Sequence, residues 1–151
     1  MDNHSQLMTT FPLFKGFTEN GTKRLLEAGE VTQHAPGEVL LKEGDSAEFV
    51  LLVLTGKLEV FVQRQGKDLV LTEAGPGAIL GELAVLCGIP RSASVRAKDA
   101  SVTLKWSDEA FRSLLLRDHS LSQRVFSGAL RTLLDKERSL IDSLIAAQTR
   151  A

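Results

Sequence analysis

One stretch of the chain combines the residue types that bind a phosphate group. Within residues 77–95, which are otherwise mostly apolar, lie Gly81, Glu82, Arg91 and Ser92. Gly81 permits a positive φ angle or a close approach of the backbone to a ligand. Residues 82–86 favour one or two helical turns, and the unpaired N–H groups at the start of so short a helix attract anions. This spacing predicts an anion site at residues 81–84.

Two further side chains narrow the class of anion. The planar guanidinium of Arg91 can donate two hydrogen bonds to one phosphate group, and Ser92 adds a hydroxyl donor beside it. Glu82 has only acceptors when it is ionised, so it needs a hydroxyl donor next to the phosphate. A cyclic 3′,5′ phosphodiester of a ribonucleotide carries one negative charge and one free ribose hydroxyl. It therefore matches this set of residues.

Short strands are expected to position these residues. Residues 31–106 contain β-type runs at 39–41, 49–54, 58–63, 69–72, 93–97 and 102–106, separated by glycine-containing turns. Regularly spaced short strands of this kind predict an antiparallel β-barrel or jelly roll. Residues 1–30 predict a helical segment, in which Thr18 caps a short helix that ends near Gly29. We expect Leu25 and Leu26 to dock that helix on the strands.

Helical periodicity returns after residue 106. Ser107 is a predicted N-cap for a helix over 108–115, and a longer helix is predicted from about 120 to 147. Apolar residues recur along the long helix at steps of three and four, and they form a wide face. We expect this face to cover the barrel, another subunit or both. The predicted fold class is α+β, mainly β: one domain over 1–151, with an antiparallel β-barrel or jelly roll flanked by an N-terminal helical segment and C-terminal helices.

Composition excludes several function classes. The 151 residues are 43% hydrophobic and 25% charged, which is typical of a globular domain. A net charge of −1 excludes a chain-wide affinity for DNA. The single cysteine, Cys87, excludes an internal disulfide and an all-cysteine metal site, and we expect it to be a packing residue. No signal peptide, membrane span or catalytic constellation is visible, so we expect a cytoplasmic, non-enzymatic binding module without a metal or cofactor.

The segments 81–84 (Gly-Glu-Leu-Ala) and 90–93 (Pro-Arg-Ser-Ala) resemble the phosphate-binding cassette of the cyclic-nucleotide-binding domain family. The glycine turns at Gly37, Gly44 and Gly56 and the trailing helices follow the order of that family, so the resemblance covers about residues 11–147. The chain looks most like the sensor domain of the bacterial catabolite activator branch, without its DNA-binding domain.

The resemblance implies a role for each cassette residue. Glu82 would accept the ribose 2′-hydroxyl, and Arg91 would bind the exocyclic phosphate oxygens with help from Ser92 and the amides of Leu83 and Ala84. The base would lie between apolar side chains, and Lys136 stands on the long helix near the position where the activator branch has a hydroxyl that touches the base. The expected ligand-binding set is Leu71, Leu80, Gly81, Glu82, Leu83, Ala84, Arg91, Ser92, Ala93, Val95 and Lys136. The expected ligand is cyclic AMP, and cyclic GMP stays open because Ser92 can meet a guanine amino group.

Other readings of the same residues stay open. Glu82 and Arg91 could form a structural ion pair that only holds a loop. The chain could be a ligand-free dimerisation or interaction module, the regulatory part of a larger channel, kinase or transcription factor, or an enzymatic jelly roll. As partners we expect the cyclic nucleotide and, through the C-terminal helix, a second copy or another protein. We expect no direct binding to DNA or to membranes.

Overall fold

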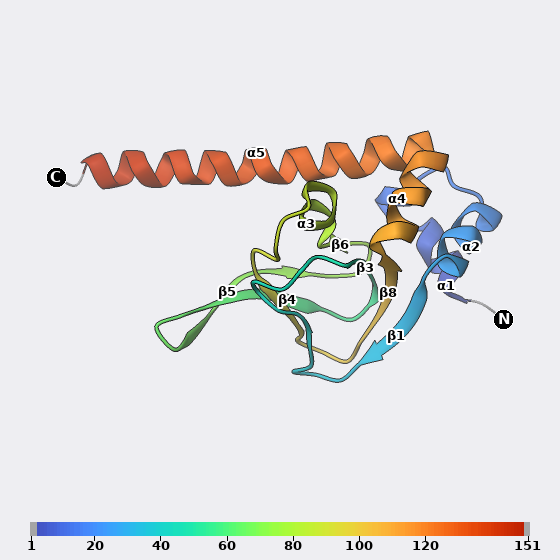
Figure 1. Cartoon of the computed structure of the whole chain (residues 1–151), viewed down its shortest axis with the longest axis horizontal. Coiled ribbons are helices and arrows are strands. Elements are labelled where there is room, and N and C mark those ends of the chain that lie inside the picture. Colours follow the sequence, from blue (N-terminus) through green and yellow to red (C-terminus); the bar gives the residue numbers. More distant parts are fainter. Residues whose placement is uncertain (1–2, 150–151) are drawn as a thin grey trace.

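The computed structural model describes residues 3–149 (Figure 1). Its helices and strands follow one another in this order: α1 (Asn3–Thr9), η1 (Pro12–Phe14), α2 (Glu19–Glu27), β1 (Glu30–His34), β2 (Val39–Leu41), β3 (Phe49–Thr55), β4 (Leu58–Arg64), β5 (Lys67–Ala74), β6 (Ile79–Leu80), α3 (Glu82–Cys87), β7 (Ser94–Ala97), β8 (Ser101–Ser107), α4 (Asp108–Arg117) and α5 (His119–Thr149). The predicted order of a helical segment, strands and trailing helices is confirmed. The strands β1 and β6 were not among the predicted runs.

The strands form two antiparallel sheets of four strands each, with the orders β1-β8-β3-β6 and β2-β7-β4-β5. The α+β, mainly β, jelly-roll prediction is confirmed. The closed barrel named beside it is wrong, because within residues 3–149 the strands pair in two separate sheets and do not close into one.

Strand β3 is covered on one face by the second sheet and on the other face by the helices. Its side chains alternate, as those of every strand do, between the two faces of the sheet. Leu51 and Val53 pack against the second sheet, whereas Val50, Leu52 and Leu54 pack against the helices. Both faces of β3 are therefore buried, and the strand reads as a continuous apolar run.

The predicted helix caps are present. The Thr18 side chain accepts a hydrogen bond from the Gly21 amide, and the Ser107 side chain accepts one from the Ala110 amide, both at 3.1 Å. Leu25 and Leu26 are buried, so α2 docks as expected. The indole nitrogen of Trp106 donates to the Leu25 carbonyl and ties the last strand to that helix.

The last helix, α5, has two parts. Near its start Leu121, Val125 and Ala129 are buried against the rest of the chain. The remainder passes over α3 and runs on beyond the sheets (Figure 1). Within the part of the chain that the structure describes, no helix is long and apolar enough to cross a membrane.

Candidate functional site

A cavity of about 520 Å³ lies between the β2-β7-β4-β5 sheet, α3 and α5. Its size falls within the range typical of small-molecule sites. The wall is mostly apolar, with a few charged and hydroxyl side chains. The lining residues are Leu41, Val60, Thr72, Glu73, Ala74, Gly75, Pro76, Ala78, Ile79, Leu80, Gly81, Glu82, Leu83, Ala84, Arg91, Ser92, Ala93, Val95, Thr132 and Lys136.

Gly81 begins α3 in a conformation that only glycine adopts easily. Its φ angle is +82°, in the left-handed region. A Cβ atom at this position would also clash with Nη1 of Arg91. The N–H groups of the first turn, including those of Leu83 and Ala84, have no acceptor within the helix. Gly81 therefore allows α3 and the arginine to meet at one wall of the cavity.

Arg91 is buried, with 5% of its surface exposed. Its Nη1 donates to the Gly81 carbonyl at 3.0 Å, and its Nη2 donates to the Phe49 carbonyl at 2.5 Å. Its backbone is bonded on both sides to the loop that contains Gly44 and Asp45. A guanidinium has five N–H donors, so three are left after these two bonds. The arginine is thus held in place by backbone carbonyls and keeps donors for a ligand.

Glu82 lies in the first turn of α3 and is partly buried. Burial raises the pKa of its carboxyl, because the charged form loses hydration, while its own backbone N–H and the charges of Lys136 and Arg91 act in the opposite direction. Burial also lowers the pKa of Arg91, against the raising effect of the Glu82 charge. The two side chains line the same cavity, but no salt bridge joins them. The reading of the pair as a loop-holding ion pair is therefore wrong.

Ten of the eleven ligand-binding residues predicted from the sequence line this cavity. The exception is Leu71, whose side chain is 60% exposed on β5 and which does not line the cavity. The reason is a register shift: Val60 pairs with Thr72 and Phe61 pairs with Val70, so Leu71 is skipped. Such a bulge turns the extra residue away from the regular alternation. Thr72 lines the cavity, and Leu71 is withdrawn from the predicted base contacts.

The sequence prediction also missed a hydroxyl on the long helix. Thr132 lines the cavity one turn before Lys136, and its hydroxyl donates to the Gly128 carbonyl. Residues four apart lie on the same helix face. The four-residue spacing between Thr132 and Lys136 was the signal from which Thr132 could have been predicted. The expectation that Lys136 replaces the hydroxyl was therefore incomplete, since α5 offers both groups to the cavity.

Two further observations concern the exposure of Cys87 and the arrangement of possible metal ligands. Cys87, at the end of α3, is exposed, so the prediction that it is a packing residue is wrong. Among residues 3–149 no cluster of three histidine, cysteine, aspartate or glutamate residues is placed to hold a metal ion.

Comparison with known proteins points to one family. The family model of the cyclic nucleotide-binding domain matches residues 31–118. A cAMP-dependent protein kinase regulatory subunit from Blastocladiella emersonii is 32% identical over 119 residues, which are 78% of this chain and 30% of that protein. The chain therefore spans less than a third of that relative.

Solved structures agree with this assignment. The catabolite activator protein of Thermus thermophilus superposes with a TM-score of 0.78 and 25% identity, over 85% of this chain and 61% of that one. The regulatory domain of the Toxoplasma gondii cAMP-dependent protein kinase, crystallised with cAMP, gives a TM-score of 0.63 and 25% identity, over 73% of this chain and 42% of that one. With the family model matching more than half of its residues, the chain belongs to the cyclic nucleotide-binding domain family.

Proposed function

We propose that this cyclic nucleotide-binding regulatory domain is a non-enzymatic sensor of cyclic AMP. The observation that carries the proposal is the arrangement of Glu82 and Arg91, which line one cavity without bonding to each other. A buried cation and a partly buried carboxylate are costly to leave without an opposite charge or a hydroxyl donor. A cyclic nucleotide supplies a partner for both, because its phosphate accepts from the arginine and its ribose hydroxyl donates to the carboxylate.

The phosphate is expected at the wall formed by Arg91 and the first turn of α3. The three remaining N–H donors of the guanidinium, the exposed Ser92 hydroxyl and the amides of Leu83 and Ala84 all belong to this wall. Glu82, in the same turn, would accept the 2′-hydroxyl. Gly81 and Ala93 border the phosphate subsite without side chains large enough to block it.

The base is expected in the apolar half of the cavity. Leu80, Val95, Val60 and Leu41 supply the apolar surface there. Thr132 carries a hydroxyl that can both donate and accept, and Lys136 can only donate. The name of the Blastocladiella relative and the bound ligand of the Toxoplasma structure favour cyclic AMP. Cyclic GMP is the alternative, because a hydroxyl such as that of Ser92 can also meet a guanine amino group.

We infer that α5 carries the signal. Thr132 and Lys136 lie on α5 and line the cavity, so a ligand that touches them binds better when α5 is held over the cavity than when it is not. A ligand shifts a conformational equilibrium only through such a difference in affinity. The partner that reads α5 is a second copy or another protein, or another part of a larger channel, kinase or transcription factor. A cytoplasmic location and the lack of DNA or membrane binding stay predictions.

Calorimetric titration with cyclic AMP and cyclic GMP tests the proposal. Arg91→Ala should weaken binding by roughly 30- to 5000-fold, since loss of one partner of a buried charged pair costs about 2–5 kcal/mol. Glu82→Ala should weaken it by roughly 10- to 150-fold, the effect of losing a hydrogen bond to a charged group.

Arg64, at the end of β4, and Glu43, in the turn after β2, form a matched pair of controls. Arg64 and Glu43 bond to each other and do not line the cavity, so Arg64→Ala and Glu43→Ala should leave affinity unchanged. If wild type binds neither nucleotide, or if the cavity variants bind as well as the controls, the proposed function is wrong. A ligand-free interaction module would then be the better description.

A further inference from the structure

A trough lies between the first part of α5 and the chain that runs from η1 to the start of α2. It consists of two hollows of about 510 and 340 Å³, which share Ser120 and Arg124. None of its residues lines the nucleotide cavity described above. We call this surface the η1–α5 trough, and its α5 wall is one helix face formed by Ser120, Gln123, Arg124, Ser127, Gly128 and Arg131.

The η1–α5 trough is positively charged. Lys15, Arg124 and Arg131 line it together with a single carboxylate, that of Asp118. Oδ1 of Asp118 accepts a hydrogen bond from the Leu121 amide at 2.9 Å, so this carboxylate caps α5. Within residues 3–149 no salt bridge joins any of the three cations to a carboxylate. Since the whole chain has a net charge of −1, this positive charge is a local feature of the trough.

The Arg124 side chain is held in a fixed orientation. Its Nη1 donates to the Leu13 carbonyl at 3.1 Å, and its guanidinium lies 5.7 Å from the centre of the Phe17 ring. A guanidinium has five N–H donors, so four are left after this bond. A fixed guanidinium with free donors is suited to a carboxylate or a phosphate, because it can give either one two parallel hydrogen bonds.

Gly128 leaves the wall of the trough open between the two arginines. Glycine in the interior of a helix is less favourable than alanine. A Cβ atom at position 128 would meet nothing within 4 Å, so packing within the described part of the chain does not require a glycine here. The missing side chain instead lets a ligand approach the helix backbone between Arg124 and Arg131.

The dimensions of the trough favour an extended peptide over a small anion. Ser120, Gln123 and Ser127 are exposed, whereas a typical small-molecule site encloses most of its ligand. Arg124 and Arg131 are about 10.5 Å apart along the helix axis, at about 1.5 Å per residue. In a polyproline II segment, side chains three residues apart share one face and lie about 9.3 Å apart. Two acidic side chains at that spacing therefore match the two arginines.

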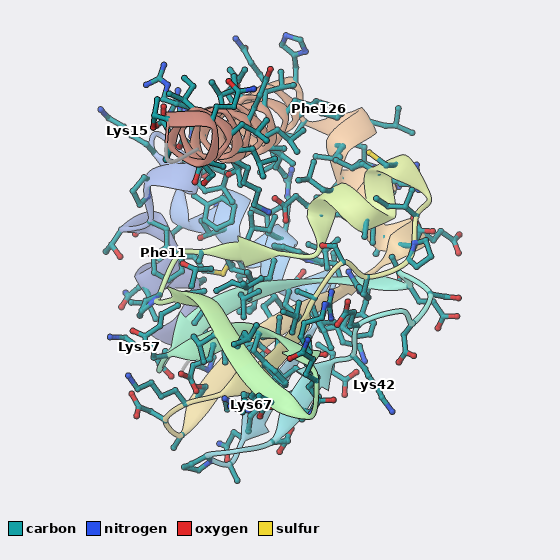
Figure 2. The ribbon with its side chains drawn as sticks, turned by 90° about the vertical axis from the view of Figure 1, so that its left-hand side faces the viewer. Phe11, Lys15, Lys42, Lys57, Lys67 and Phe126 are labelled. Carbon is teal, nitrogen blue, oxygen red and sulfur yellow. The ribbon has the colours of Figure 1, made fainter. Side chains whose placement is uncertain are left out.

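We propose that the η1–α5 trough binds an acidic segment of a partner protein, in which carboxylates three residues apart meet Arg124 and Arg131. The hydroxyl and amide side chains of the trough can bond to the backbone of this segment, and Lys15 extends the positive surface past Arg124. Figure 2 views α5 end-on, with Lys15 on one side of the helix and Phe126 on the other. The trough is therefore distinct from the exposed apolar side of α5 near Phe126.

The trough and the nucleotide cavity share α5, and their coupling rests on the proposed function. The Gly128 carbonyl accepts the hydroxyl of Thr132, which lines the cavity. Arg124 belongs to the packed part of α5, whereas Arg131 follows Ala129, after which nearly every residue is exposed. A nucleotide that holds Thr132 also fixes Arg131 relative to Arg124, which lowers the ordering cost of binding the segment. Each ligand therefore strengthens the binding of the other by the same factor.

Fluorescence anisotropy with a labelled peptide tests the site on the full chain without nucleotide. The probe has three aspartates, one at every third position among prolines. One control peptide has asparagines in their place, and another has its three aspartates side by side. The probe should bind, the asparagine peptide should not, and the third should bind several-fold more weakly. Equal binding of the probe and either control peptide, or no binding of the probe, overturns the proposal.

Two matched substitutions locate the binding surface. Arg131→Ala should weaken peptide binding by roughly 2- to 5-fold, the effect of losing an exposed charge pair. Arg138→Ala removes the same charge from the same helix face about two turns further on, beyond the trough, and should leave affinity unchanged. Equal affinities of these two variants contradict the proposed location.

Arg124 is expected to contribute more than Arg131. Arg124→Gln should weaken peptide binding by roughly 10- to 150-fold, the effect of losing hydrogen bonds to a charged group. Arg24→Gln, on the exposed surface of α2 outside the trough, is its control and should bind like wild type. Thermal unfolding checks that both variants are folded. A folded Arg124→Gln variant with wild-type affinity overturns the proposal.

Filling the space at Gly128 tests whether the segment passes over it. Gly128→Leu places a large side chain in the trough and should weaken peptide binding by at least roughly tenfold. Leucine is a strong helix former, so the helical circular dichroism should be kept. Ser139→Leu adds the same side chain at an exposed position outside the trough and should have no effect. Wild-type affinity of Gly128→Leu contradicts the proposed path of the segment.

Anionic vesicles distinguish a peptide site from a membrane site. Cosedimentation with phosphatidylserine vesicles should not exceed that with neutral phosphatidylcholine vesicles. If wild type cosediments with the anionic vesicles, Arg131→Ala does not, and the peptide fails to bind, the trough is a membrane-binding surface and the proposal is wrong.

Repeating the peptide titration in saturating cyclic AMP tests the coupling of the two sites. The peptide should bind about fivefold more tightly or better, the usual range for coupled sites. Unchanged peptide affinity refutes the coupling. If calorimetry finds that wild type binds no cyclic nucleotide, the proposed function fails, whereas the peptide titrations without nucleotide have already decided the trough.

Discussion

At the scale of single residues, the candidate site combines a glycine in the left-handed conformation with charges that have no opposite charge bonded to them. Gly81 adopts a left-handed conformation directly against the guanidinium of Arg91, and Glu82 follows it in a partly buried place. Buried charges without such a partner lower the stability of the free domain, and binding sites commonly accept that cost for function. Removing the buried charge should therefore have opposite effects on stability and on affinity.

The pH dependence of the free energy of unfolding tests whether the Glu82 charge lowers the stability of the free domain. Burial raises its pKa above the ordinary value of 4.5, so the folded state holds a proton that the unfolded state has released. The free energy of unfolding of the ligand-free domain should therefore fall as pH rises from about 4.5 through the raised pKa. Glu82→Gln should remove this decline and stabilise the free domain at pH 7, while it weakens cyclic AMP binding. Urea unfolding between about pH 4 and 8 measures the effect.

The matched control for that experiment is Glu43→Gln. The hydrogen bond from Arg64 lowers the pKa of Glu43, so this carboxylate favours folding above pH 4.5 and loses its contribution as pH falls. Its replacement should change the pH dependence in the opposite direction. Identical pH profiles for wild type and Glu82→Gln would contradict the burial of the Glu82 charge.

Substitution of Gly81 tests the close approach of its backbone to the Arg91 side chain. Gly81→Ala imposes about 1–2 kcal/mol of backbone strain and also displaces the arginine side chain, so it should lower both stability and cyclic AMP affinity. Gly88, at the other end of α3, also has a positive φ angle, but a Cβ there meets nothing within 4 Å. Gly88→Ala should lower stability through the backbone strain alone and leave affinity unchanged. Thermal unfolding and calorimetry separate the two effects, and equal affinity of both variants would exclude a role for the Gly81–Arg91 contact.

At the scale of elements, the bulge in β5 decides which of its side chains line the cavity. Leu71 is skipped in the pairing of β5 with β4 and is mostly exposed, whereas Leu80 on β6 lines the cavity. Leu71→Ser should change stability by less than about 0.5 kcal/mol and leave cyclic AMP affinity within about twofold. Leu80→Ser should weaken binding several-fold through the loss of apolar contact. If Leu71→Ser is the more damaging change, the register of β5 is shifted when ligand is bound.

At the scale of the whole molecule, the sheets and the first part of α5 form a packed body from which the rest of α5 extends (Figure 1). Hydrogen exchange should reflect that division. On addition of cyclic AMP, amides around Thr132 and Lys136 should become more protected, because the ligand holds this part of α5 over the cavity. The helix α4, which packs on the core through Phe111 and Leu115 and does not line the cavity, serves as the internal control. Unchanged exchange over residues 130–147 would refute a signalling role for α5.

The candidate site is largely predictable because its signals are local. Residues within a few positions of one another set three local features, which are the cap at Thr18, the cap at Ser107 and the Gly81–Glu82 turn. Backbone propensities and cap hydrogen bonds act over the same short range, so a single sequence reveals them. The cassette residues from Leu80 to Val95 belong to one continuous segment. For that reason the order of residue types along the chain is enough to predict them.

What the tertiary structure decided depends on contacts between distant residues. The outward place of Leu71 follows from the pairing of β5 with β4, and the place of Thr132 follows from the direction in which α5 crosses the cavity. Contacts between distant residues also decide that the strands form two separate sheets instead of a closed barrel. They likewise decide that Glu82 and Arg91 are not bonded to each other. The sequence by itself predicted the residues between Leu80 and Val95 that line the cavity and that we propose to bind a cyclic phosphate and a ribose hydroxyl. Only long-range packing decided which other side chains meet them, because strand register and helix direction are set by the sum of many weak contacts across the fold.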